Sequence, residues 1–198
     1  MNIGKPLVIL IALAAGALSG CTGSSDGSDS SSSVPGTGAG STASIARQPA
    51  PGSCHATGSG DFSEPDPHCT PGALNPAVTQ ATIDQTICVR GWSAAVRPPA
   101  SVTDREKIAS MASYGDSGPP SDYEYDHLVS LELGGASNDP RNLWPEPGRS
   151  PNHKDAVENQ LHRLVCDRQM SLARAQRIIA TDWVGWARRG GGGASTSE

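Results

Sequence analysis

Residues 123–158 carry the pattern that most constrains how this chain can fold. They read YEYDHLVSLELGGASNDPRNLWPEPGRSPNHKDAVE. The opening YEYDHLVSLEL is rich in β-forming side chains and partly alternates, which is typical of a strand. The run GGASNDP suits neither a helix nor a central strand, so it predicts a loop. A short strand at residues 141–144 and a helix beginning near Lys154 complete a predicted order of strand, loop, strand and helix.

An Asp-His pair, Asp126 and His127, lies inside the first predicted strand. A histidine is suited to general-base catalysis because its ordinary pKa lies near neutrality. An aspartate next to it, together with polar groups on a following helix, can hold a divalent metal ion. The order of residues therefore indicates metal-assisted hydrolysis.

The run DHLVSLELGG, then NDPRNLWPE, then a helix opening with KDAVEN, resembles the motif of the HNH-type (ββα-metal) nucleases. The resemblance covers roughly residues 123–166. It implies that His127 is the general base that activates a water to attack a scissile phosphorus. It also implies that Asp126 is a ligand of a divalent metal, either magnesium, manganese or zinc. Asn142 would tie the loop between the strands and orient His127.

The second metal ligand is less clearly marked, because the usual histidine in its Cys-His…Lys setting is missing. The candidates lie in the first turns of the predicted helix: His153, Asp155, Glu158, Asn159 and His162. Four of these, all but His153, share one helical face. His153 best matches the motif by its distance from Asn142, whereas KDAVEN suggests a divergent subgroup marked by Lys-Asp-x-x-Glu. His153, Asp155, Glu158 and His162 all stay open.

The distribution of charge bears on the partner. The formal net charge of −5 by itself argues against nucleic acid. Residues 54–140 carry 4 Lys/Arg against 12 Asp/Glu, whereas residues 141–189 carry 9 against 5. The basic half includes Arg141, Arg149 and Lys154, which we expect to contact substrate phosphates, with simple solvation as the alternative. A basic region beside the motif favours a nucleic acid, here DNA, as the partner.

The N-terminus predicts export. A single Lys precedes an apolar run at residues 7–18 that is too short for a typical membrane span, as in a secretory signal. Its ending, Leu-Ser-Gly-Cys, resembles a bacterial lipobox, which implies cleavage before Cys21 and lipid on its sulfur. Residues 1–20 are thus a signal peptide, and the Ser/Gly-rich residues 21–53 a flexible tether. Residues 54–189 form the nuclease-like domain and residues 190–198 a disordered tail. The expected location is extracytoplasmic, on the bacterial cell envelope through a lipid anchor.

Four cysteines remain in the predicted domain: Cys54, Cys69, Cys88 and Cys166. An even number in an exported chain predicts two disulfides. Three pairings are possible. We favour Cys54–Cys69, which closes a local loop, and Cys88–Cys166, which ties distant segments. A zinc site is the alternative, disfavoured because no C-x2-C pair is present.

The predicted fold class is α+β: a small ββα-metal hairpin-plus-helix motif packed with about three further helices. Helices are expected over residues 76–89, 104–113, 155–166 and 171–188. A capping box, Thr103 followed by Glu106, marks the start of the second, whose Ile108, Met111 and Ala112 should face inward. Residues 95–97 suggest a short strand, and Trp144 a core anchor.

Together these features predict metal-dependent hydrolysis of DNA phosphodiester bonds by an exported enzyme. The alternative is a non-catalytic binding or structural lipoprotein that keeps the scaffold. The net negative charge and the absence of the histidine that usually ends the motif motivate that alternative.

Overall fold

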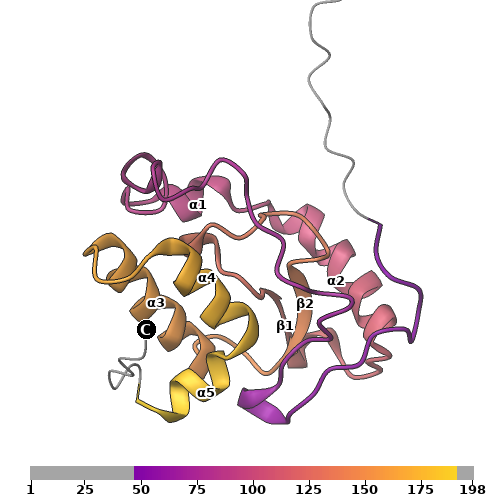
Figure 1. Cartoon of the computed structure of the whole chain (residues 1–198). Coiled ribbons are helices and arrows are strands. Elements are labelled where there is room, and N and C mark those ends of the chain that lie inside the picture. The colour runs from indigo at the N-terminus through magenta and orange to yellow at the C-terminus, as the bar shows by residue number, and fades with distance from the viewer. Residues whose placement is uncertain (1–46, 191–198) are drawn as a thin grey trace, which may run out of the picture. The chain divides into compact units, whose positions relative to one another are not determined.

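The computed structural model describes residues 47–190. The predicted signal peptide, Cys21, most of the tether and residues 191–198 lie outside this range. The described residues form five α-helices and one antiparallel two-stranded sheet, which confirms the α+β prediction (Figure 1). The helices are α1 (Trp92–Val96), α2 (Ala100–Tyr114), α3 (His153–Cys166), α4 (Leu172–Thr181) and α5 (Trp183–Arg188).

The sheet is a hairpin of β1 (Tyr123–His127) and β2 (Leu143–Pro147). Asp126 lies opposite Trp144, and His127 opposite Leu143. The prediction of a strand continuing through Leu133 was wrong. The chain leaves β1 at His127 and forms a 3-10 turn, η4 (Leu131–Leu133). Residues 127–131 are buried at every position, whereas successive side chains of a strand point to opposite faces.

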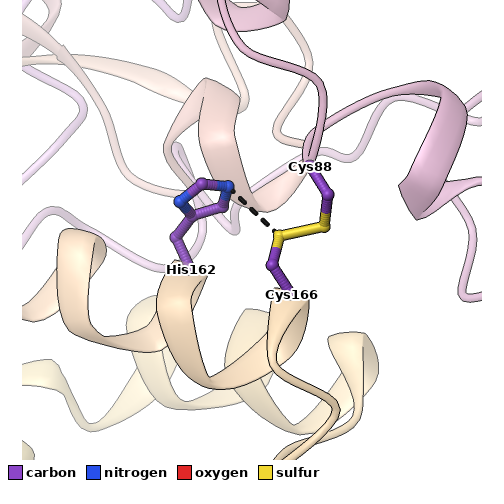
Figure 2. A group of neighbouring side chains, drawn as sticks. All are labelled: Cys88, His162 and Cys166. Atoms are coloured by element: carbon purple, nitrogen blue, oxygen red, sulfur yellow. Dashed lines mark hydrogen bonds between the residues drawn. A yellow bond between two sulfur atoms is a disulfide. The ribbon is translucent and has the colours of Figure 1, made fainter.

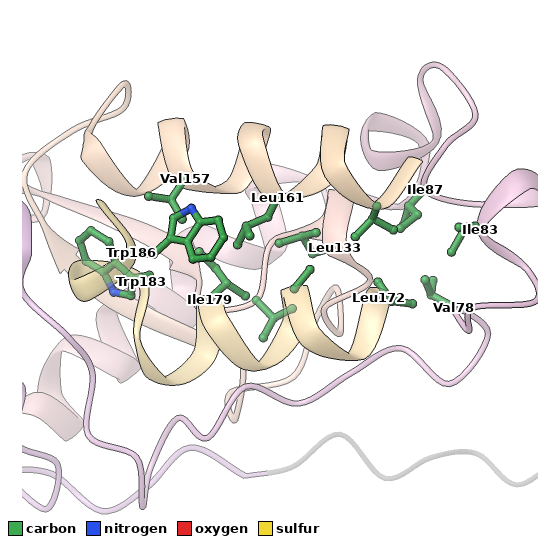
Figure 3. Packing of buried hydrophobic residues seen from close by; sticks show 13 residues of the cluster. Val78, Ile83, Ile87, Leu133, Val157, Leu161, Leu172, Ile179, Trp183 and Trp186 are labelled. Atoms are coloured by element: carbon green, nitrogen blue, oxygen red, sulfur yellow. The ribbon is translucent and has the colours of Figure 1, made fainter. Parts of the chain in front are cut away.

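The main core lies around α3. Val157, Leu161 and Val165 project from one face of this helix and are at most 4% exposed. They pack with residues of α4, α5 and η4 (Figure 3). Burying each such side chain contributes about 1.5–3 kcal/mol, so this stripe fixes the orientation of α3.

The C-terminal helix predicted over residues 171–188 is divided in two. Ser171 caps α4 as expected, because its side chain accepts a hydrogen bond from the Arg174 amide. The backbone breaks from helical geometry at Asp182, between α4 and α5. Trp183 and Trp186 are then both buried in the α3 core.

Helix α2 packs against the hairpin through a different set of contacts. It begins at Ala100 after Pro99, so Thr103 lies within the helix rather than capping it. Met111 is buried as expected, but Ile108 is 53% exposed and Ala112 is exposed. The inward face uses serines instead. Ser113, for example, donates to the Pro49 carbonyl at 2.7 Å.

The segment before Cys54 also belongs to the domain. Gln48 donates to the Tyr125 hydroxyl at 3.0 Å, and the Gly52 amide donates to the Ala112 carbonyl at 2.8 Å. The boundary predicted at residue 53 is therefore too late, because composition alone does not show that this stretch pairs with α2.

Two further predictions of local structure were wrong. Residues 76–89 form turns and one short 3-10 helix, η2 (Ile83–Gln85), yet Val78, Ile83 and Ile87 still enter the core. Residues 95–97 do not form a strand, since Trp92–Val96 is helical. Trp144 is fully buried, as expected of a core anchor, and lies 6.0 Å from the Tyr114 ring.

Both favoured disulfides are present. Cys54–Cys69 closes a loop with a sequence separation of 15, and Cys88–Cys166 spans 78. Disulfides persist in oxidising compartments, so both are compatible with an extracellular protein. Within residues 47–190, every helix is too short or too polar to cross a membrane.

Candidate functional site

The loop between the strands is held by Asn142, which is fully buried. Its Oδ1 accepts from the Val129 amide at 2.9 Å, and its Nδ2 donates to the carbonyls of Val129 and Ala136, each at 3.0 Å. A side-chain amide that meets three buried backbone groups fixes the path of the loop. Asn142 thus occupies the loop-tying position that the sequence predicted.

The glycine pair of the motif has a steric basis. Gly134 adopts φ +79, in the left-handed region that favours glycine. A side chain at Gly135 would place its Cβ 1.8 Å from the Val129 carbonyl oxygen and 2.6 Å from the Asn142 Nδ2. The loop can therefore approach Asn142 only with glycine at this position.

His127 ends β1 and is 5% exposed. Its Nε2 lies 3.0 Å from the Ser137 carbonyl oxygen in the same loop. A carbonyl only accepts, so Nε2 carries the hydrogen and Nδ1 is the basic nitrogen of the neutral ring. Burial lowers the pKa of His127 despite the opposing hydrogen bond to Ser137 and the charge of Asp126. The imidazole is thus neutral at physiological pH, with its proton-accepting atom determined.

Lys154, on the first turn of α3, is 1% exposed. Its Nζ donates to Asp126 Oδ2 and to Glu158 Oε1, each at 2.5 Å, and to the His127 carbonyl at 2.8 Å. The ammonium therefore lies between Asp126, the first metal ligand expected from the sequence, and Glu158, one of the open candidates for the second. Burial would lower the pKa of Lys154, but the carboxylates of Asp126, Glu158 and Glu146 raise it, so the amine remains charged.

Glu146, on β2, adds a third carboxyl group that is 1% exposed. Burial, followed by repulsion from Asp126, raises the pKa of Glu146 to about 10. Its Oε2 is buried with no hydrogen-bond partner in the described part of the chain. Glu146 is therefore protonated at neutral pH and can donate its hydrogen to Asp126.

The other two carboxyls differ in protonation. Burial raises the pKa of Glu158 to about 8, against the opposing pull of Lys154. Burial alone would also raise the pKa of Asp126. The charge of Lys154 and the hydrogen bond from Glu146 have a larger effect, so the pKa of Asp126 is lowered. We name Asp126, Glu146, Glu158 and Lys154 the carboxylate–lysine cluster. Three carboxyl groups share one ammonium, so Asp126 is the ionised acid and the neutral form is favoured for Glu146 and Glu158.

The structure separates the helix candidates for a metal ligand. Among these candidates, only Glu158 contacts the same Lys154 Nζ that pairs with Asp126. Asp155 instead completes a capping box with Asn152 and also accepts from Ser150. The exposed His153 stacks on Phe62 with ring centroids 4.8 Å apart. His162 Nε2 lies 2.9 Å from the Ile87 carbonyl, near the far end of α3. The Asn159 side chain donates to the Asp155 carbonyl.

The three expected phosphate contacts also differ. Lys154 is buried in the cluster and does not face solvent. Arg141 is exposed, but its guanidinium pairs with Asp139 at 2.6 Å. Arg149 is exposed and donates through Nε to the Ser121 carbonyl at 3.0 Å. The positive charge of the exposed Arg97 adds to the lowering of the pKa of His127 and opposes the rise in the pKa of Glu124, as expected of a cation near the hairpin.

One group of possible soft metal ligands lies away from this site. Cys88, His162 and Cys166 bring their ligand atoms within 4.8 Å of one another. Cys166 Sγ lies 3.4 Å from His162 Nε2 (Figure 2). Both sulfurs are joined in the Cys88–Cys166 disulfide, however. This group could hold a metal only after reduction, because thiolate and not disulfide sulfur is the metal ligand.

Sequence reasoning missed Glu146 and the position of Lys154. The available signal was a single acid within the otherwise apolar run NLWPEP, on a strand expected to anchor the core. A carboxyl in such a run is expected to be buried and therefore to need a buried partner. Lys154 is a cation nearby in the sequence that could be that partner.

Comparisons of this chain with protein-family models, with curated proteins and with solved structures found no match.

Proposed function

We propose that this domain hydrolyses phosphodiester bonds in DNA with the help of a divalent metal ion. The observation that carries the proposal is the geometry of His127. Its Nε2 is bound to the Ser137 carbonyl, its pKa is lowered by burial, and its loop is fixed by Asn142. A neutral, oriented imidazole with Nδ1 as the basic atom is what general-base activation of water requires.

The residues of the carboxylate–lysine cluster fit a hard divalent cation. Magnesium and manganese prefer carboxylate oxygens, and zinc also accepts them. The Asp126 and Glu158 side chains are 16% and 11% exposed, against 2% for Lys154, so solvent reaches the acids more readily than the amine. Glu146 adds a buried oxygen without a partner among residues 47–190. Asp126 and Glu158 would hold the ion, with Glu146 beside them.

A bound metal ion would supply positive charge near the phosphate and the leaving oxygen. The chain's own part is to prepare and hold the proton acceptor. His127 Nδ1 accepts a proton from water while Nε2–H stays bonded to Ser137. The nearby Asp126 charge favours the imidazolium that forms, since it opposes the effect of burial on the pKa of His127. The exposed Arg97 offers a cation to the substrate phosphate.

A second candidate function follows from Lys154. Its ammonium already lies 2.5 Å from both Asp126 and Glu158, the two acids proposed for the metal. A domain in which lysine permanently replaces the metal would bind DNA or a partner protein without cleaving it. This is the non-catalytic cell-envelope protein considered from the sequence.

The test is plasmid cleavage by the whole chain with magnesium, manganese or zinc, and with a chelator. Cleavage that is lost in chelator and in His127→Ala supports the enzyme. The matched control is His55→Ala, at an exposed loop histidine outside the site. Intact plasmid with every metal would refute the nuclease and favour the non-catalytic function. An RNA substrate assayed in parallel distinguishes the two nucleic acids.

Metal binding is measured separately by calorimetry with manganese. Glu158→Gln should weaken it, whereas Asn159→Asp, on the exposed face of α3, should not. Equal binding by wild type and Glu158→Gln would remove Glu158 from the proposed ligands.

We also propose that the domain acts at the cell envelope, anchored through lipid on Cys21. The two disulfides support export, because such bonds persist in oxidising compartments. Labelling with a radioactive fatty acid tests the anchor, and Cys21→Ser should abolish the label. Labelling that survives this change would refute it.

A further inference from the structure

A pocket of about 380 Å³ lies where α2, the start of β1 and the segment after β2 meet. Its lining includes Thr103 and Lys107 of α2, Tyr123 and Glu124 of β1, and Arg149 and Ser150 after β2. We call it the hairpin-end pocket. It combines the cations of Lys107 and Arg149 with hydroxyl groups, including those of Thr103 and Ser150, and these are donors that a phosphate group accepts.

The two cations of this pocket are not neutralised by acids. Lys107 Nζ donates to the Tyr123 carbonyl at 2.6 Å, and Arg149 Nε donates to the Ser121 carbonyl at 3.0 Å. Neither forms an ion pair with a carboxylate of residues 47–190. Each carbonyl uses one donor of a side chain that has several, so the remaining N–H groups can bind a ligand.

Other arginines of this chain contrast with this arrangement. Ion pairs hold the side chains of Arg141, Arg168 and Arg189, with Asp139, Asp84 and Asp182 respectively. Lys107 and Arg149 instead have their positions fixed by neutral carbonyl groups. Their full charges therefore remain available, in side chains that are already oriented.

The acids of the pocket do not exclude an anion. Asp104 also lines it but is exposed to solvent, which screens its charge. Glu124 is half-buried, and neither acid forms an ion pair with Lys107 or Arg149.

The pocket continues the proposed active site along β1. Glu124 and Asp126 lie two residues apart on one face of the strand, and His127 lies on the other face at the end of β1. Glu124 and His127 are three residues apart, or about 10 Å along a strand. A phosphate in the pocket is therefore a different phosphate from the one that is cut.

We propose that the hairpin-end pocket binds a backbone phosphate of DNA next to, but not part of, the bond that is cut. Lys107 and Arg149 are its main ligands, with the Thr103 and Ser150 hydroxyls beside them. This subsite deepens the proposed function and rests on it for its position relative to the cut. It predicts that the chain prefers substrates that carry at least one further phosphate beside the cleaved bond.

The test compares Lys107→Ala/Arg149→Ala with Arg174→Ala/Arg177→Ala, which removes two exposed arginines of α4 from outside the pocket. Binding of a fluorescent DNA duplex is measured by anisotropy in chelator at several salt concentrations. If the pocket variant no longer binds one phosphate, the slope of log K against log salt should fall by about 0.9, which is about 10-fold in affinity at 50 mM salt. The α4 variant should bind like wild type. Equal weakening in both variants would indicate diffuse attraction and overturn the subsite.

A second measurement separates the subsite from the chemistry. Bis(p-nitrophenyl) phosphate contains one diester and no second phosphate for the pocket, so its hydrolysis should be unchanged in Lys107→Ala/Arg149→Ala. A loss of this activity, or a large fall in melting temperature, would mean that the two residues support the fold and would overturn the proposal. Wild type that binds DNA through the pocket but cleaves neither substrate would retain the subsite and remove the nuclease. Wild type that does not bind DNA would overturn the subsite.

Discussion

Replacing Lys154 with Met removes the only ammonium of the carboxylate–lysine cluster while keeping a long apolar stem. Asp126, Glu146 and Glu158 would then face one another without a cation. Removing one partner of a buried ion pair costs about 3–5 kcal/mol, because the other charge is left uncompensated. The Asp126 and Glu158 side chains retain 16% and 11% exposure, and both can take up protons, so we expect the lower end.

A loss of about 3 kcal/mol should lower the melting temperature by about 12 °C, at roughly 4 °C per kcal/mol for a domain of this size. The deficit should depend on pH. Without the ammonium, the folded-state pKa values of Glu146 and Glu158 lie further above their unfolded values. The variant then loses stability as pH rises through the folded-state pKa values. Its melting temperature should therefore fall further below that of wild type at pH 8 than at pH 5.

Thermal unfolding followed by circular dichroism at both pH values, with and without manganese, measures these effects. Manganese at 100 times its dissociation constant adds about 2.7 kcal/mol to any protein that binds it only when folded. At one fixed manganese concentration, the ion should raise the melting temperature of Lys154→Met more than that of wild type if the ion and the ammonium compete for the same acids. Arg163→Met, an exposed position of α3, is the control. A melting temperature of Lys154→Met within 2 °C of wild type at pH 8 would refute the role of Lys154 as counter-ion.

Three more predictions concern stability. Asn142→Ala should cost about 2–4 kcal/mol in chemical denaturation, because it leaves two buried and one part-buried backbone group without partners; a loss under 1 kcal/mol would contradict the loop-tying role of Asn142. Asp66 accepts from the His68 and His55 amides, which lower its pKa, so its contribution is present above pH 3.8 and lost as pH falls through the folded value. Asp66→Ala should therefore destabilise by about 1–2 kcal/mol at pH 7 and by less near pH 2, and a difference independent of pH would argue against this. Alanine at both Cys88 and Cys166 should cost about 4.5 kcal/mol, against about 3 for the Cys54–Cys69 pair, because the loop is longer; equal losses would show that loop length does not decide.

Sequence was sufficient where one local pattern decides the outcome. The apolar stripe Val157, Leu161 and Val165 has helical spacing, and α3 forms with these side chains buried. The Ser171 cap is likewise a local signal. Residues 128–133 were misjudged because a short apolar run fits a buried strand and a buried turn equally well. Only the packing of Leu131 and Leu133 beneath the loop decides between them.

The candidate site shows the same division. The positions of His127 and Asn142 follow from their order in the motif and from the glycine pair between them. The burial of Lys154 cannot be predicted from the sequence, because a lysine in the first turn of a helix is usually solvated. Its burial depends on how the core turns α3 relative to the hairpin, and residues such as Leu161 and Trp183 set that orientation from a distance.

The three hydrogen bonds of Lys154 also have a consequence for local opening. The side chain belongs to α3, but two of its acceptors, the Asp126 carboxylate and the His127 carbonyl, belong to β1. Separating helix from hairpin would expose a charged amine and its acids at once. A two-stranded hairpin has little stability of its own. The amides of β1, β2 and the first turn of α3 should therefore exchange with deuterium as one cooperative unit, whereas the ends of α2 and α5 open independently.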